Sequence, residues 1–130
     1  MSLKTIKGLF WVAAGYDLVL GFVFGLFYPM VYARFGIELP NHPGYLQLSA
    51  AYIFIFGIMF SLVARNPKAN REMIFVGILM KLGFCAVVFG HLACDTIPPI
   101  YPPFAVLDLI FIVLFLPAYT ALKKMDLAVP

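Results

Sequence analysis

Residues 73–93 read MIFVGILMKLGFCAVVFGHLA, an apolar stretch that is interrupted near its middle by Lys81. A helix crosses the roughly 30 Å hydrocarbon core of a bilayer with about 20 residues, which is close to the length of this stretch. A charged residue at the bilayer centre costs at least about 2.5–3.5 kcal/mol on insertion scales, so it normally faces the inside of a bundle and finds a partner. The stretch therefore predicts a membrane-spanning helix whose lysine points toward other helices.

The composition of the whole chain agrees with a membrane protein. Of its 130 residues, 64% are hydrophobic and 12% are charged, whereas soluble domains carry roughly 25% charged residues. Three further apolar stretches, 8–32, 45–64 and 104–122, have lengths suited to a spanning helix. The connections between them are short and rich in charge, glycine or proline, which leaves no room for a second domain. We expect a single all-α domain over 1–130, an integral membrane four-helix bundle with antiparallel neighbours.

The basic residues indicate an orientation in the membrane. With four spans, Lys81 lies within a span, the other side carries only Arg34, and one side carries the remaining seven: Lys4, Lys7, Arg65, Lys68, Arg71, Lys123 and Lys124. The positive-inside rule therefore predicts a multi-pass protein of the inner (cytoplasmic) membrane with both termini in the cytoplasm. The net charge of +3 follows from this topology, so the lipid bilayer is the expected partner and nucleic acid is not.

Three ionisable residues lie within the predicted spans: Asp17, Lys81 and Asp108. At about 1.5 Å rise per residue, Asp17 and Lys81 each fall about 12–15 Å from the cytoplasmic boundary, so we expect them to contact each other. Asp108 falls only about 6 Å from the outer boundary, where Lys81 reaches it by extending upward. Two acids and one base leave an excess negative charge, so one carboxyl group, Asp108 first, is expected to be neutral or to face water. An ion pair that only fixes helix register and a ligand or proton site both remain open.

Helical spacing places these charges on stripes with aromatic residues. At about 100° per residue, three stripes can face a common interior: Gly77, Lys81, Phe84, Val88, His91 and Asp95; Asp17, Gly21, Phe24 and Tyr28; Asp108, Ile112, Phe115 and Tyr119. Such an interior suits an amphipathic ligand such as a quinone or another lipid-like molecule. We expect Asp17, Lys81, Asp108, Tyr28, Phe84, His91 and Phe115 to form its pocket. Ordinary core packing is the alternative.

A metal site is a further candidate at the outer end of the third helix. His91, Cys94 and Asp95 have the i, i+3, i+4 spacing that gathers side chains on one helix face, and His42 in the first outer loop can add a fourth ligand. Imidazole, thiolate and carboxylate suit zinc or copper. The alternative is that these residues only mark where the helix leaves the membrane.

Gly21 and Gly25 form a G-x-x-x-G pattern. This pattern allows two helix backbones to approach closely. Because Gly21 lies one turn from Asp17, we expect the contact within the bundle rather than between subunits, although a homo-oligomer or a larger membrane complex remains open.

Several quoted segments resemble one family. The passage LPNHPGYLQLSAAYIFIFG at 39–57, the turn ARNPKANRE at 64–72 and the helix segment GILMKLG at 77–83 are similar in layout to the DoxX-like group of small four-helix bacterial membrane proteins. The resemblance covers most of the chain and implies four spans. It also implies quinone-linked or thiol redox chemistry, and so a redox-accessory role, although this chain lacks the C-x-x-C of a thiol–disulfide enzyme.

Two other classes of function remain open. The chain also resembles the small multidrug resistance transporters, four-helix proteins with an acidic residue in helix 1, which implies that Asp17 binds a proton and a substrate. This chain has Asp where that family has Glu, and Lys81 would compete with a cationic substrate. A structural or accessory subunit of a larger membrane complex is the third class. No motif in the sequence assigns a catalysed reaction.

Overall fold

The computed structural model describes residues 1–127, which form five helices. They are α1 (Leu3–Leu26), α2 (Tyr28–Arg34), α3 (Gly44–Arg65), α4 (Arg71–Ala93) and α5 (Tyr101–Leu127). Four of them, α1, α3, α4 and α5, are long and apolar enough to cross a membrane. The all-helical class and the four long apolar helices are therefore as predicted, and α3 and α4 begin and end within two residues of the predicted bounds.

The first predicted span is wrong at its C-terminal end. The sequence predicted one helix over 8–32, but α1 ends at Leu26 and the short helix α2 begins at Tyr28. Pro29 explains the break, because proline has no N–H to donate to the preceding turn and fits best in the first turn of a new helix. Phe27 between the two helices has φ −112° and ψ 13°, outside helical values.

The fourth span is longer than the predicted 104–122. Helix α5 begins at Tyr101, so Pro102 and Pro103 lie in its first turn. These prolines do not exclude the segment from a helix, because the N–H groups of a first turn have no acceptor within the helix. At its other end α5 extends through Lys123 and Lys124 to Leu127, since charged residues end an apolar span without ending a helix.

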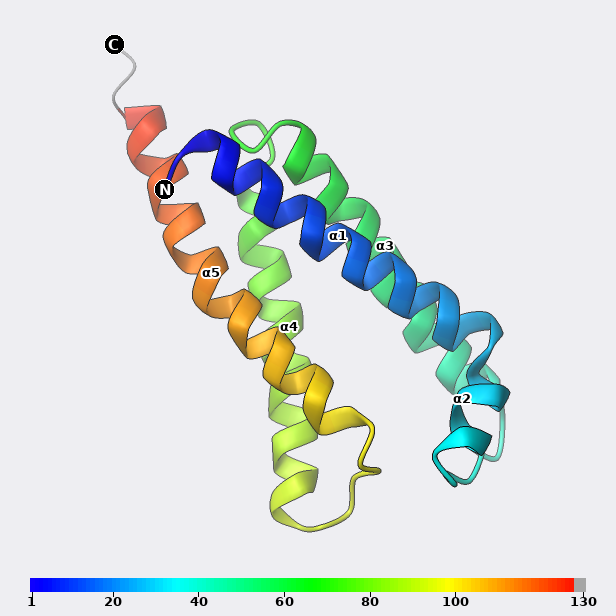
Figure 1. The fold of residues 1–130 in the computed structure, drawn as a ribbon. Coiled ribbons are helices and arrows are strands. Elements are labelled where there is room, and N and C mark those ends of the chain that lie inside the picture. The colour runs from blue at the N-terminus through cyan, green and yellow to red at the C-terminus, as the bar shows by residue number, and fades with distance from the viewer. Residues whose placement is uncertain (128–130) are drawn as a thin grey trace.

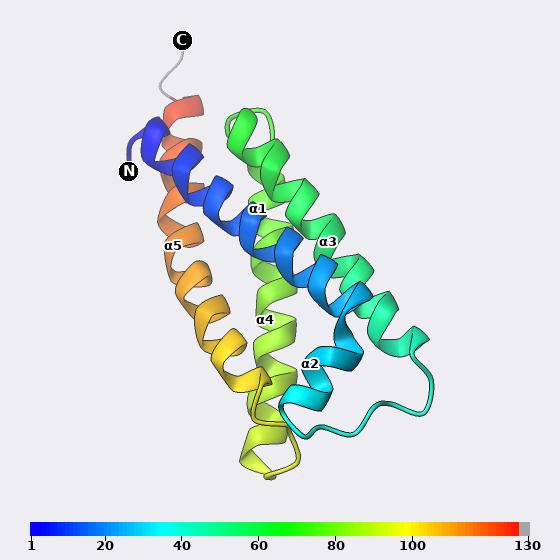
Figure 2. The same ribbon diagram turned by 45° about the vertical axis from the view of Figure 1, so that its right-hand side comes forward.

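The long helices associate in two pairs. Helix α1 packs mainly against α3, and α4 packs mainly against α5. Figures 1 and 2 show the start of α1 and the end of α5 at one end of the molecule, together with the connection between α3 and α4. In both views the pairs lie close together at that end and diverge toward the end that carries α2.

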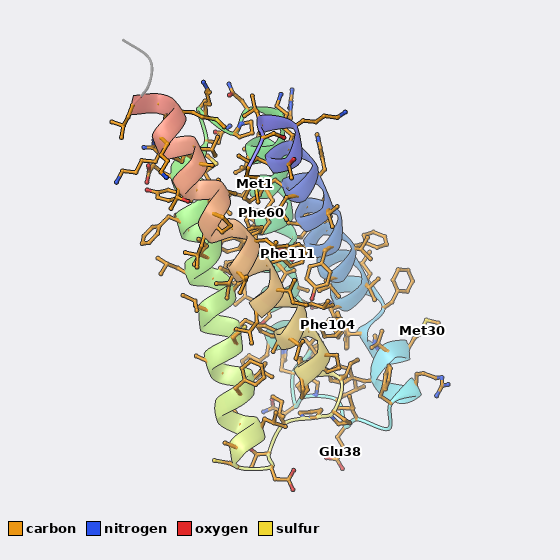
Figure 3. The ribbon with its side chains drawn as sticks, turned by 60° about the vertical axis from the view of Figure 1, so that its left-hand side comes forward. Met1, Met30, Glu38, Phe60, Phe104 and Phe111 are labelled. Carbon is orange, nitrogen blue, oxygen red and sulfur yellow. The ribbon has the colours of Figure 1, made fainter. Side chains whose placement is uncertain are left out.

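An aromatic cluster joins the two pairs at the end where they meet. The rings of Phe10 and Phe115 stack with centroids 4.6 Å apart, and Phe60 meets Phe115 edge-on at 5.2 Å. These three side chains come from α1, α5 and α3 and are fully buried. Figure 3 shows Phe60 and Phe111 between the helices of the two pairs. Aromatic pairs of this geometry contribute about 0.5–1.5 kcal/mol beyond their buried area, so the cluster fastens one pair to the other.

Gly21 accounts for the close contact of α1 with α3. A Cβ atom at this position would lie 2.7 Å from the Phe54 Cβ and 2.8 Å from the Ala50 carbonyl oxygen. Only a residue without a side chain fits that space. The prediction that the G-x-x-x-G contact lies within the chain is thereby confirmed.

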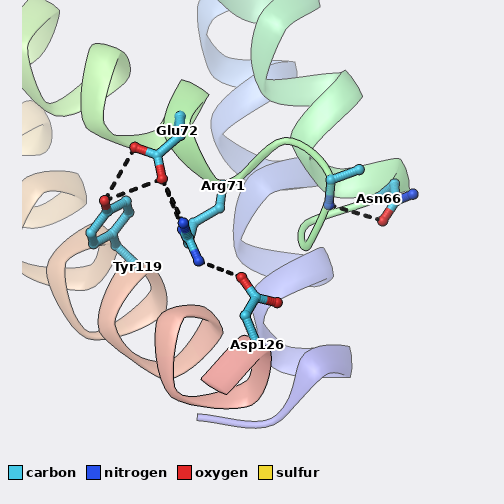
Figure 4. A network of polar contacts seen from close by, with 6 residues as sticks. Asn66, Arg71, Glu72, Tyr119 and Asp126 are labelled. Atoms are coloured by element: carbon cyan, nitrogen blue, oxygen red, sulfur yellow. Dashed lines mark hydrogen bonds and ion pairs between the residues drawn. The ribbon is translucent and has the colours of Figure 1, made fainter. Parts of the chain in front are cut away.

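A polar network connects α4 to α5 near the termini (Figure 4). Arg71 pairs with Glu72 at 2.8 Å and also with Asp126, and the Tyr119 hydroxyl donates to Glu72 at 3.2 Å. In the preceding turn the Asn66 side-chain oxygen accepts from the backbone N–H of Ala69 at 3.4 Å. The network ties the start of α4 to the last turns of α5.

The outer faces of the long helices are apolar and uncovered. Exposed fractions reach 64% for Val12, 61% for Val19 and 67% for Val113. Contiguous apolar surface on this scale is unfavourable in water and is what hydrocarbon chains cover in a bilayer. This surface and the four apolar helices indicate a multi-pass membrane protein.

Candidate functional site

Lys81 lies between two carboxylates. Its Nζ donates to Asp108 Oδ1 at 2.6 Å and to Asp17 Oδ1 at 3.3 Å. All three side chains are buried, with side-chain exposures of 1% for Lys81, 3% for Asp17 and 7% for Asp108. The predicted Asp17–Lys81 contact is therefore present, and we call the three residues the buried triad.

The nearer partner of Lys81 is Asp108, which differs from the expectation. The sequence placed Asp108 near the outer boundary and made Asp17 the main partner. Because α5 begins at Tyr101 rather than at residue 104, Asp108 lies deeper in its helix than predicted. It is 5% exposed and lines a cavity described below, and its expected neutral state or contact with water stays a prediction.

Three aromatic rings surround the Lys81 ammonium group. Its Nζ lies 5.0 Å from the ring centroid of Phe111, 5.3 Å from that of Tyr16 and 5.7 Å from that of Phe60. An ammonium group within about 6 Å of an aromatic centroid is attracted by the ring, and more so where water is excluded. Lys81 is thus held both by carboxylates and by the aromatic residues of α1, α3 and α5.

Two polar atoms beside the buried triad have no hydrogen-bond partner among the described residues. They are the Tyr16 hydroxyl and the second carboxylate oxygen of Asp17, Oδ2. A buried polar atom left without a partner costs about 1–3 kcal/mol, and more when it is charged. Such atoms in a native structure point to a water molecule, an ion or a ligand.

A cavity of about 600 Å³ is lined at one end by Tyr16 and Asp17 and at the other by Tyr32 of α2 and by residues of the loop that follows α2. Its inner wall includes Tyr16, Asp17 and Asp108, and its outer part includes the exposed residues Glu38 and Tyr45. All five helices contribute to the remaining lining, which is mainly apolar and aromatic: Leu20, Phe24, Tyr32, Ile37, Pro40, Leu46, Ser49, Ala50, Tyr52, Ile53, Met80, Phe84, Pro98, Tyr101 and Phe104. Its volume lies within the roughly 300–1,000 Å³ typical of small-molecule sites.

The structure brings only part of the predicted pocket together. Asp17, Asp108 and Phe84 line the cavity, and Lys81 lies directly behind the two carboxylates. Phe115 instead belongs to the aromatic cluster with Phe10. Tyr28 is half-buried at the start of α2 and does not line the cavity.

His91 was also expected in the pocket and lies outside it. The side chain is exposed, and its Nδ1 is 2.9 Å from the Thr96 hydroxyl. The last turn of α4 extends past the start of α5 (Figures 1 and 2). No helix therefore covers the face of α4 at His91, although residues nearer the middle of the same face, such as Val88, are buried.

The structure does not form the predicted metal site. Within residues 1–127, no group of three or more His, Cys, Asp or Glu side chains is placed to hold a metal ion. Helix α4 ends at Ala93 and Asp95 has a φ of 54°, so the helical spacing assumed for His91, Cys94 and Asp95 does not continue. His42 uses its Nδ1 to accept from the backbone N–H of Gly44 at 3.0 Å.

Two features of the site were missed from the sequence. One is Tyr16, which precedes Asp17 in the middle of α1. A phenol in the middle of an apolar span is a signal of a polar site, as a charged residue is. The hydroxyls of Tyr32 and Tyr101 hydrogen-bond to each other at the cavity wall, joining α2 to α5. The sequence contains no signal for this pairing, because the two residues are far apart in the chain.

Comparison with known proteins does not identify the site: no family model matches the chain, and no curated protein or solved structure matches it. The resemblance to the DoxX-like group therefore stays an expectation from layout. The cavity and the buried triad are what the function must be argued from.

Proposed function

We propose that this chain is an inner-membrane protein with four antiparallel spans, α1, α3, α4 and α5, and with both termini in the cytoplasm. The excess of lysine and arginine near the termini and in the α3–α4 connection supports this orientation. In Figure 1 these three parts of the chain lie at the same end of the molecule. The cavity then opens toward the outer side of the membrane.

Within this arrangement, the proposed function is the binding of an amphipathic ligand. The observation that carries it is the cavity of about 600 Å³, whose apolar and aromatic walls end on the buried carboxylates of Asp17 and Asp108. A dry helix bundle held together by an ion pair is expected to be close-packed, without a space of this size next to residues that carry unpartnered polar atoms. A ligand with an apolar body and one polar head matches both parts of the site.

A quinone or a related lipid is the ligand class that the DoxX-like resemblance favours. The cavity walls can hold an isoprenoid or acyl chain, and Tyr16 supplies a hydroxyl at the inner end. In that reading the protein is a redox-accessory subunit that holds the ligand for a partner, since its own residues include no redox motif.

The experiment compares two tryptophan variants on the same helix. Ser49 is exposed and lines the cavity, whereas the neighbouring Leu48 is 55% exposed and does not line it. Ser49→Trp therefore fills the cavity, and Leu48→Trp adds the same bulk on the outer surface. Each protein is purified in mild detergent, and bound molecules are identified by absorbance and mass spectrometry.

We expect an amphipathic molecule to co-purify in near-equal amount with the wild type and Leu48→Trp, and to be lost from Ser49→Trp. Equal recovery of every lipid and cofactor from all three proteins would contradict ligand binding in the cavity.

A further inference from the structure

The two unpartnered oxygen atoms restrict the kind of head group that fits the cavity. Asp17 is 2% exposed, lines the inner wall and uses only Oδ1 for Lys81, so Oδ2 is an acceptor without a donor. The hydroxyl of the preceding residue, Tyr16, is also unpaired among the described residues and can accept as well as donate. Both residues line the cavity, but these two oxygen atoms expose almost no surface, so a head group reaches them only when the Asp17 or Tyr16 side chain turns toward it.

The charge of the site points the same way. Lys81 supplies one positive charge to two carboxylates, at 2.6 and 3.3 Å, so with both acids ionised the buried triad carries one formal negative charge, the excess that a neutral carboxyl group or water was expected to relieve. Among the described lining residues, Glu38 adds a third carboxylate at the outer part, and no lysine, arginine or histidine lines the cavity. A buried excess charge is stabilised by an opposite charge brought to it.

The walls are suited to a cation. Tyrosine and phenylalanine rings line the cavity from Tyr16 at its inner end to Tyr45 at its outer end. Aromatic faces attract ammonium groups, most strongly where water is excluded. The same rings give an apolar chain a surface to pack on.

We propose that the cavity selects an amphipathic amine: a protonated primary or secondary ammonium head that donates to Asp17 Oδ2 and the Tyr16 hydroxyl, followed by an acyl or alkyl chain along the aromatic wall. This inference rests on the proposed binding of an amphipathic ligand and names an amine in place of the quinone as that ligand. A head that only accepts hydrogen bonds, such as the carbonyl of an oxidised quinone, leaves Asp17 Oδ2 unpaired. Lys81 does not exclude a cation, because it already lies between Asp17 and Asp108.

The test uses three probes that share a twelve-carbon chain. Dodecylamine is charged and donates hydrogen bonds, dodecyltrimethylammonium is charged and cannot donate, and dodecanol donates without charge. Binding is measured by isothermal titration of the protein in nanodiscs of zwitterionic lipid, and the signal of empty nanodiscs is subtracted. We expect dodecylamine to bind at least about tenfold more tightly than either other probe, since a hydrogen bond to a charged group contributes about 1.5–3 kcal/mol.

Two variants and a matched control connect this preference to the named atoms. Asp17→Asn leaves the Lys81–Asp108 pair in place and is expected to reduce the preference for dodecylamine about tenfold. Tyr16→Phe removes the second oxygen without touching an ion pair and should reduce the preference about fivefold. Asp95→Asn removes the same charge at an exposed residue outside the cavity, and the preference should stay at the wild-type value.

The outcomes separate this inference from the proposed function. If Ser49→Trp abolishes binding but all three probes bind equally, the cavity binds amphiphiles and the amine inference is overturned. Tighter binding of dodecyltrimethylammonium would also overturn it, because the aromatic walls alone would then select the cation. If no probe shows binding that Ser49→Trp removes, both proposals fail. If Asp17→Asn does not fold, the probe series on the wild type and on Tyr16→Phe still decides.

Discussion

The most consequential residue of this chain is Lys81, which is completely buried and shared unequally by two carboxylates. The 2.6 Å contact with Asp108 is the shorter one, and Asp17 has an oxygen to spare. The two acids therefore have different roles: Asp108 balances the lysine, and Asp17 also faces the cavity.

This inequality predicts how the triad responds to substitution. Lys81→Met leaves two buried carboxylates without a counter-charge and should lower the free energy of unfolding by about 3–5 kcal/mol. Asp17→Asn should cost less than Asp108→Asn, because Lys81 keeps its nearer partner. The measurement is unfolding in mixed detergent micelles, with the single and double variants arranged as a double-mutant cycle.

The double variant Asp108→Asn with Lys81→Met should be milder than Lys81→Met alone, since only one carboxylate is left. Simple addition of the two single losses would show that Lys81 and Asp108 are not coupled.

At the scale of helices, the α1–α3 pair depends on a small residue at the contact. Gly21→Leu should destabilise the protein by about 1–3 kcal/mol or more, as overpacking does, because a Cβ atom there would be 2.7 Å from Phe54. Gly15→Ala on the same helix is the control, since nothing lies within 4 Å of its added Cβ. That control should be neutral or stabilising by up to about 1 kcal/mol, the difference in helix propensity.

Thermal unfolding in detergent measures both glycine variants. A Gly21→Leu protein with the stability of the wild type would mean that the two helices do not approach as closely as the structure has them.

Helix α2 is held at the cavity by the Tyr32–Tyr101 hydrogen bond. Tyr32→Phe removes the bond, so we expect faster amide hydrogen exchange over residues 28–34 with little change in the unfolding temperature, because short helices are unstable without tertiary contacts. Tyr28→Phe is the matched control, as no hydrogen bond of the Tyr28 hydroxyl occurs within residues 1–127.

If exchange over residues 28–34 is the same in both tyrosine variants, the hydroxyl pair does not hold α2. Slower exchange on addition of a ligand that fills the cavity would support α2 as part of its wall.

For the whole molecule, the proposed orientation makes a prediction about fusions. A reporter that is active only in the cytoplasm should give signal when fused after residue 127, whereas the same reporter inserted in the α4–α5 connection, residues 94–100, should be silent. The basic residues near both termini and in the α3–α4 connection are the reason.

The matched reporter that is active only outside the cytoplasm serves as the control and should give the reverse pattern. A silent C-terminal fusion together with an active insertion at 94–100 would overturn the topology.

The sequence by itself determined the parts of this protein that depend on one segment at a time. Long apolar runs form helices wherever water is absent, because each backbone group must find its hydrogen bond within the segment. The depth of Lys81 and Asp17 followed from the rise per residue, and their contact is present at 3.3 Å. Pro29 was also a signal in the sequence for a helix break, but residues 8–32 were predicted as one continuous span.

The tertiary structure decided everything that depends on the distance and rotation between helices. The start of α5 at Tyr101 sets the depth of Asp108, and packing against Phe10 takes Phe115 away from the cavity. His91 is exposed because the last turn of α4 extends past the start of α5. The cavity exists because the helix pairs meet through Phe10, Phe60 and Phe115 and diverge beyond them, and divergence is a property of paired surfaces that no single helix encodes.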